Sequence, residues 1–159
     1  MEIYEKIERL IVLPKRIAEY ERNRSRLLEA KSPDFGDKPS SGSKTNSSED
    51  KSIKYADYSK QIDELKKERA KLAIEIQKEL DEKLPGEQTM DIELREVMKS
   101  SFIDFKTIEM IGKTVIFRSK NYTSDLFHLG CAKLAIPKET IDQVRQWSRK
   151  LAQLNKNVE

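Results

Sequence analysis

The residues whose types and spacing suggest chemistry lie near the C-terminus, between positions 138 and 150. Gln143 and Gln146 carry amides that can hold adenine through two hydrogen bonds, and Arg149 carries the paired donors that suit guanine. A helix through this segment would set these side chains on one outward face. The residues predicted to contact DNA bases are Lys138, Glu139, Gln143, Gln146 and Arg149.

Three further cations lie in or beside the same segment. Lys and Arg bind phosphate oxygens, and such contacts add affinity without reading the base sequence. The residues predicted to contact DNA phosphates are Lys133, Arg145 and Lys150.

The segment from Ser124 to Leu151 resembles the helix-turn-helix motif of DNA-binding regulators. Two helices that cross steeply at a tight turn need small residues where they touch and apolar residues on both sides. Cys131 is the small residue of the first helix, and Pro137 suits the start of the second. The apolar residues that fit are Leu134, Ile136, Ile141, Val144, Trp147 and Leu151. Two residues depart from the motif. Gly130 lies where the motif usually has a larger apolar residue, and Ala135 lies where it usually has a glycine.

No set of residues suggests catalysis or a metal site. His128 and Cys131 are the only histidine and the only cysteine, so a zinc site is not expected. The triplet Gly112-Lys113-Thr114 lacks the earlier glycine of a phosphate-binding loop. No nucleophile is paired with a base. We therefore expect a protein that is not an enzyme and needs no cofactor.

Charge is unevenly distributed along the chain. The net charge is +3 over 159 residues, yet Met98 to Glu159 holds eleven Lys and Arg against six Asp and Glu. A basic C-terminal third is the pattern expected of a segment that meets an anionic partner such as DNA.

The composition favours a cytoplasmic protein. A single cysteine cannot form an internal disulfide, which suits a reducing compartment. The first 30 residues are rich in Glu, Lys and Arg, unlike a secretory signal. No run approaches the roughly 18–20 apolar residues that a membrane span needs. No membrane contact is expected.

The elements that must position these residues are mostly helical. Apolar residues recur at three- and four-residue steps over Glu2–Ala30 and Ser52–Leu84, which predicts two amphipathic helices. Pro14 predicts a kink or break in the first helix. The polar stretch 31–51 between them is predicted to be a mobile loop. The two helices are predicted to form an antiparallel hairpin. Because such a hairpin buries little area, it needs a partner, either the C-terminal domain or a second copy of the chain.

After Pro85-Gly86, the pattern predicts helices over Met90–Phe102, with Asp91 as a possible N-cap, and over Phe105–Gly112. Lys113–Lys120 has a β-rich centre and could be a strand or an extended link. The sequence thus predicts a mostly α fold: a coiled-coil-like helical hairpin over 1–86, and a basic helix-turn-helix domain over 87–159 with at most one short β element.

A second, longer resemblance covers Glu2–Val97. This layout is similar to phage-encoded regulators of the ArpU/sigma-region-4-like group, which place a charged helical hairpin before a helix-turn-helix. The shared features are Ser32-Pro33-Asp34-Phe35, the Ser/Gly/Asp-rich loop, the helix with Ile62, Leu65, Leu72 and Ile76, and Phe102-Ile103-Asp104-Phe105-Lys106-Thr107. The resemblance implies transcription regulation by a phage or mobile element.

Two functions follow as hypotheses. The first is a sequence-specific regulator that binds double-stranded DNA as a homodimer. The second is a protein-interaction module that binds a host protein and inhibits or redirects it, for which the long charged hairpin and the departures at Gly130 and Ala135 argue.

Overall fold

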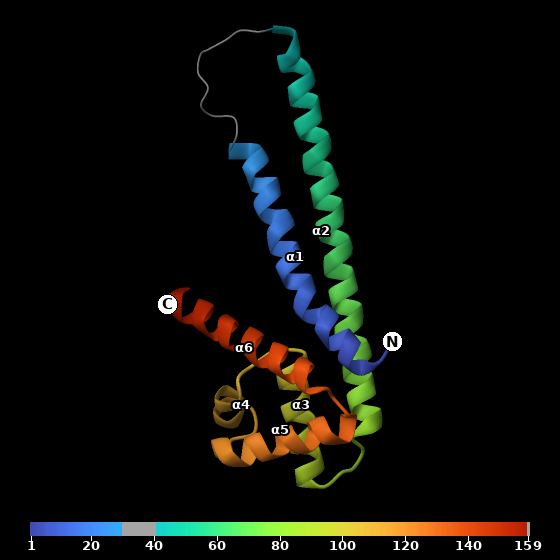
Figure 1. Ribbon diagram of the computed structural model, residues 1–159, viewed down its shortest axis with the longest axis vertical. Coiled ribbons are helices and arrows are strands. Elements are labelled where there is room, and N and C mark those ends of the chain that lie inside the picture. Colours follow the sequence, from blue (N-terminus) through green and yellow to red (C-terminus); the bar gives the residue numbers. More distant parts are fainter. Residues whose placement is uncertain (30–40, 159) are drawn as a thin grey trace. The chain divides into compact units, whose positions relative to one another are not determined.

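The computed structural model describes the backbone of residues 1–29 and 41–158, and the side chains of 1–29 and 49–156 (Figure 1). Within these ranges every regular element is an α-helix, so the mostly α fold predicted from the sequence is confirmed. The helices are α1 (Ile3–Glu29), α2 (Ser41–Lys83), α3 (Thr89–Phe102), α4 (Ile108–Thr114), α5 (Lys120–Leu134) and α6 (Lys138–Val158). The segment 113–120 contains no strand: it ends α4, bends, and begins α5.

The chain divides into two compact units, one made of Met1–Ile11 with Lys71–Glu159 and the other of Val12–Ala70. The division falls inside α1 and α2, and not at residue 86 where the domain boundary was expected. In the first unit a hydrogen bond joins the start of α1 to α6. Thr140 Oγ1 of α6, fully buried, donates a hydrogen bond of 2.7 Å to Glu8 Oε1 of α1.

In the first unit the start of α1 and the end of α2 share an apolar seam. Ile7 and Leu10 of α1 and Ile76 and Leu80 of α2 are at most 2% exposed. Lys6 Nζ donates to Glu79 Oε1 across this seam at 2.5 Å. Buried residues spaced three or four apart on both helices account for the pairing.

The second unit is an antiparallel pair formed by the rest of α1 and the first part of α2 (Figure 1). Ile17 and Ile62 are buried between the helices. The rings of Tyr20 and Tyr58 lie 6.0 Å apart, and Arg24 Nη1 donates to Ser59 Oγ at 3.2 Å.

Two predicted boundaries of these helices differ from the structure. Pro14 does not break α1, because buried residues on both sides of it, Leu13 and Ile17, hold the same face. Helix α2 begins at Ser41, whereas the sequence predicted a loop as far as residue 51. Residues 41–51 contain no proline, and extending an existing helix costs far less than starting one. The rest of the predicted loop, 31–40, lies outside the described residues, as does residue 30, which was predicted to end the first helix.

Helices α3, α4 and α5 form the core that carries α6. Met98 and Phe102 of α3, Ile111 of α4 and Phe127 of α5 are at most 2% exposed, and the rings of Phe102 and Phe127 lie 5.8 Å apart. Helix α3 begins one residue earlier than predicted, with Gln88 as its N-cap. Asp91, expected as the cap, instead accepts the Gln88 amide at 3.2 Å from within the first turn.

Gly130 explains how closely α5 crosses α3. A Cβ placed on Gly130 would lie 2.2 Å from Met98 Sδ, closer than any real contact. The glycine that departs from the helix-turn-helix pattern therefore marks a direct contact between two helices, and a larger apolar residue would not fit here.

Candidate nucleic-acid interface

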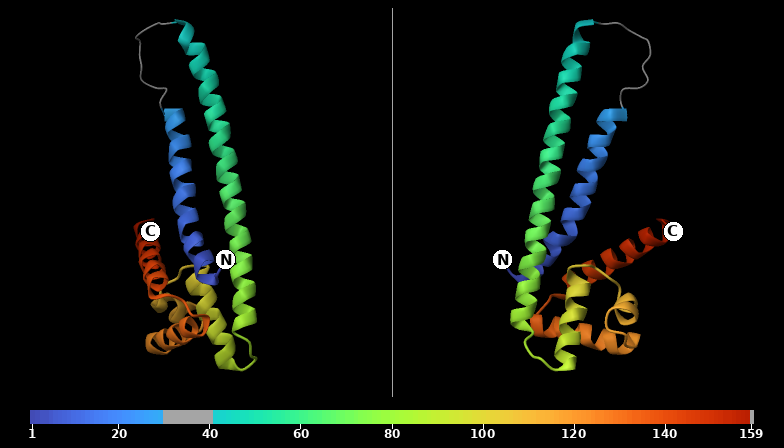
Figure 2. Two further views of the ribbon diagram at one scale, coloured as in Figure 1. Left: turned by 45° about the vertical axis from the view of Figure 1, so that its right-hand side comes forward. Right: turned by 180° about the vertical axis from the view of Figure 1, so that it is seen from behind.

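A tight turn separates α5 from α6 at the position predicted from the sequence. Ala135 takes a left-handed backbone conformation, with φ 54° and ψ 46°, and caps α5. The Ile136 amide then donates to the Cys131 carbonyl at 3.0 Å, and the Ile136 side chain is buried. This is the usual way to close a helix when the next residue packs back on it. As a result α6 leaves in a new direction and does not continue α5 (Figure 2).

Helix α6 has one buried face and one exposed face. Thr140, Val144, Trp147 and Ser148 are buried, which anchors the first half of the helix. All five residues predicted to contact bases are exposed: Lys138, Glu139, Gln143, Gln146 and Arg149. Asp142 and Gln153, which were not predicted, are exposed as well.

The three cations predicted to contact phosphates do not form one cluster. Lys133 is exposed on α5 and Lys150 is exposed on α6. Arg145 is half-buried, since its guanidinium lies 5.6 Å from the centre of the Phe127 ring and its Nη2 lies 3.4 Å from His128 Nε2. Arg145 and Lys150 are separated by about 140° around the helix axis, which follows from five residues at about 100° each.

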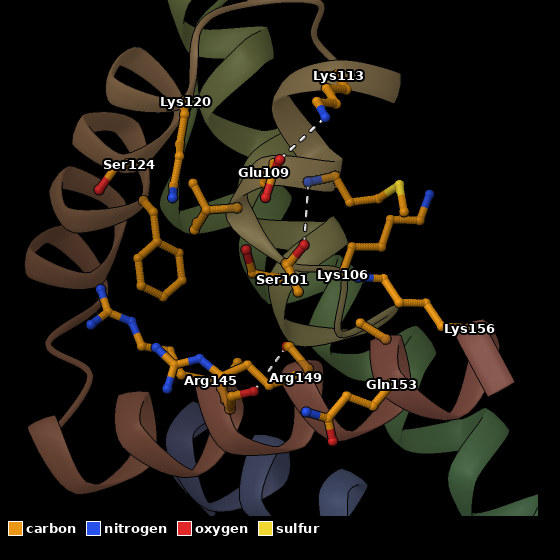
Figure 3. Close-up of a pocket in the computed structure, with 17 residues that line it drawn as sticks. Ser101, Lys106, Glu109, Lys113, Lys120, Ser124, Arg145, Arg149, Gln153 and Lys156 are labelled. Atoms are coloured by element: carbon orange, nitrogen blue, oxygen red, sulfur yellow. Dashed lines mark hydrogen bonds and ion pairs between the residues drawn. The ribbon is translucent and has the colours of Figure 1, made fainter.

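Arg145 instead belongs to a groove between α4, the start of α5 and α6 (Figure 3). The groove encloses about 680 Å³. Its cations come from all three helices and from the residue that precedes the α4 cap: Lys106, Lys113, Lys120, Arg145, Arg149 and Lys156. We call this the basic groove. Its apolar lining residues are Ile108, Met110, Phe127, Val144 and Ala152.

Glu109 is the only carboxylate that lines the basic groove among the described residues. Lys113 Nζ donates to Glu109 Oε1 at 3.2 Å. This hydrogen bond, reinforced by the charges of Lys113, Lys120 and Lys156, holds the pKa of Glu109 below its usual range. The other groove lysines and Arg149 make no ion pair with any described side chain. The groove therefore has an excess of positive charge.

Local caps fix the two helices that frame the groove. The Thr107 hydroxyl accepts the Met110 amide at the start of α4, and the Ser119 hydroxyl accepts the Tyr122 amide at the start of α5, each at 3.2 Å. Such caps satisfy amides that have no partner inside the helix.

A polar network ties the start of α5 to α3. Glu93, whose side chain is 11% exposed, accepts hydrogen bonds from Arg118 Nε at 2.8 Å and from the Tyr122 hydroxyl at 2.9 Å. The Arg118 hydrogen bond lowers the pKa of Glu93, although partial burial opposes the shift. The network holds the bend before α5 in place, and with it Lys120.

Sequence reasoning missed four of the six groove cations: Lys106, Lys113, Lys120 and Lys156. They are spread over 51 positions of the chain and follow no local motif. The net positive charge of the C-terminal third was the one indication of them in the sequence.

The described residues contain no group of three potential metal ligands and no helix that could cross a membrane. Comparisons with protein-family models, with curated proteins and with solved structures found no match.

Proposed function

We propose that this protein is a sequence-specific DNA-binding regulator that docks α6 in the major groove of duplex DNA. The observation that carries the proposal is the exposed face of α6. Its Gln143, Gln146 and Arg149 side chains project from a helix that is anchored on its other side by Val144 and Trp147. An α-helix fits the major groove, and these side chains match the edges of adenine and guanine.

The surrounding charge supports the same function. Of the cations predicted to contact phosphates, Lys133 is exposed on α5 and Lys150 is exposed on α6. Cations next to a recognition helix hold phosphates and fix its register on the duplex. A homodimer, also proposed, would place two such helices on the two halves of a symmetric site.

The experiment begins with a pool of random-sequence duplexes, from which the bound fraction is recovered and sequenced. Binding of the selected duplex is then measured by fluorescence anisotropy across a salt series. We expect affinity to fall steeply as salt rises, because each phosphate contact releases a counterion.

Variants of α6 test the recognition face. Arg149→Ala and Gln143→Ala should each weaken binding of the selected duplex by about 1–3 kcal/mol and relax its sequence preference. Arg22→Ala on α1 and Gln77→Ala on α2 are matched controls, since both residues are exposed outside the interface. Circular dichroism checks that all four variants stay helical. Unchanged affinity of both α6 variants would contradict the role assigned to this face.

A second candidate is a protein-interaction module, and one observation favours it. Phe117 is 76% exposed and has a positive φ of 54°. A large aromatic side chain held out in this way is typical of an anchor at a protein interface. If this candidate is correct, the parent should bind no duplex even at low salt, and Phe117→Ser should abolish capture of a protein partner. Duplex binding by the parent, unchanged in Phe117→Ser, would argue for the first function.

A further inference from the structure

The basic groove has more positive charge than the fold needs. Six cations line it against a single carboxylate, Glu109, which already pairs with Lys113. Lys106, Lys120 and Lys156 come from separate parts of the chain, yet none has an ion pair with a described side chain. Cations that repel each other destabilise the fold unless an anion lies between them.

Ser101 is a second, independent indication of a ligand. Its side chain lines the groove from α3, and the residue is 2% exposed. Its hydroxyl has no hydrogen-bond partner among the described residues. Buried hydroxyls almost always have a partner, so one that lacks it beside a charged groove suggests that a ligand oxygen supplies it.

We propose that the basic groove is a phosphate-binding site. Phosphoryl groups carry several acceptor oxygens and more than one negative charge, which suits cations that converge from α4, α5 and α6. The enclosed volume of about 680 Å³ leaves room for more than a single ion. The phosphate group can come from two sources. One is the backbone of duplex DNA, and in that case the inference rests on the proposed function. The other is a free phosphate-bearing molecule, and in that case the inference is independent of the proposed function.

The first arm of the test uses inorganic pyrophosphate and isothermal titration calorimetry at low ionic strength. The groove variant combines Lys106→Ala, Lys120→Ala and Lys156→Ala. The charge-matched control combines Lys54→Ala, Lys60→Ala and Lys66→Ala, three exposed residues of α2. If the ligand is a free phosphate-bearing molecule, the groove variant should bind pyrophosphate about tenfold or more weakly, and the control should bind like the parent.

Two single substitutions sharpen this arm. Glu109→Gln should raise the affinity for pyrophosphate, because it removes the one negative charge in the groove, and a purely structural change would not produce such a gain. Ser101→Ala should lower the affinity for pyrophosphate without destabilising the ligand-free protein, since the hydroxyl has no partner to lose and its burial is unfavourable.

The second arm repeats the salt series with duplex DNA. Each phosphate contact contributes about 0.9 to the slope of log affinity against log salt. If the DNA backbone fills the groove, the groove variant should therefore lower this slope by about 2–3, and the control should change it by less than about 1. Gln143→Ala and Gln146→Ala remove exposed side chains that do not line the groove, so a loss of sequence preference in these two variants reports on the recognition face separately from the groove.

The outcomes divide cleanly. A groove effect on pyrophosphate alone identifies a free phosphate-bearing ligand, and an effect on duplex alone identifies the DNA backbone. If the groove variant matches the charge-matched control in both arms, the groove is not a phosphate site. Failure of the parent to bind duplex would refute the proposed function and leave the pyrophosphate arm to decide the inference.

Discussion

The contact between Gly130 and Met98 makes a sharp prediction about the core that supports α6. The perturbation is Gly130→Ala. In an exposed part of a helix, alanine is about 1 kcal/mol more favourable than glycine. Here the added methyl carbon would meet three atoms of Met98, at 2.2, 2.8 and 2.8 Å. Forcing such a group into a filled core costs about 1–3 kcal/mol.

The position of Met98 decides which effect dominates. Its side chain is 0% exposed, so it cannot swing into solvent to make room. We therefore place the packing cost near the top of its range and expect Gly130→Ala to destabilise the protein by about 1–2 kcal/mol net. Urea unfolding followed by circular dichroism measures this difference. Ala132→Gly, on the exposed face of α5, calibrates helix propensity in the same helix.

A double-mutant cycle isolates the contact itself. Met98→Ala alone should cost about 2–5 kcal/mol through the cavity it leaves. In the double variant, the new methyl group occupies part of that cavity. The double variant should therefore be destabilised by at least about 1 kcal/mol less than the sum of the two single variants. If Gly130→Ala stabilises the protein by the amount that Ala132→Gly destabilises it, and the cycle is additive, then α5 does not cross α3 as described.

Three further predictions follow from single residues. Because the pKa of Glu93 is lower in the folded protein than in the unfolded chain, its contribution to stability is present above the unfolded pKa of about 4.3 and is lost as the pH falls through the folded value. Glu93→Gln should thus have a lower free energy of unfolding than the parent at neutral pH, and this difference should disappear in acid. A difference that stays constant when urea unfolding is repeated across the pH range would count against the network. Ala135→Gly should stabilise the protein by about 1 kcal/mol, because alanine is strained at φ 54°, and a lower melting temperature would contradict this. Burial raises the pKa of the Cys131 thiol to about 12, so a thiol reagent should label it far more slowly in the native protein than in urea, and equal rates would refute its burial.

The sequence by itself determined that the fold is mostly helical and where the chain turns before α6. Apolar residues at three- and four-residue spacing need no tertiary information to specify an amphipathic face, and this held for Ile7, Ile62 and Ile76. Ala135-Ile136-Pro137 was sufficient to locate the turn before α6, because the residue before a proline is biased away from the helical conformation. The polar face of α6 followed from the same periodicity.

Tertiary structure decided which residues meet. Pro14 predicted a break, but burial on both sides of it keeps α1 continuous. Gly130 was a departure from a pattern in the sequence, and only the crossing of α3 shows why no side chain fits there. The basic groove is the clearest case, since Lys106 and Lys156 share no local pattern and line the same groove only in the folded protein. Periodicity reports the face of one helix, whereas a site built from several helices depends on how they pack.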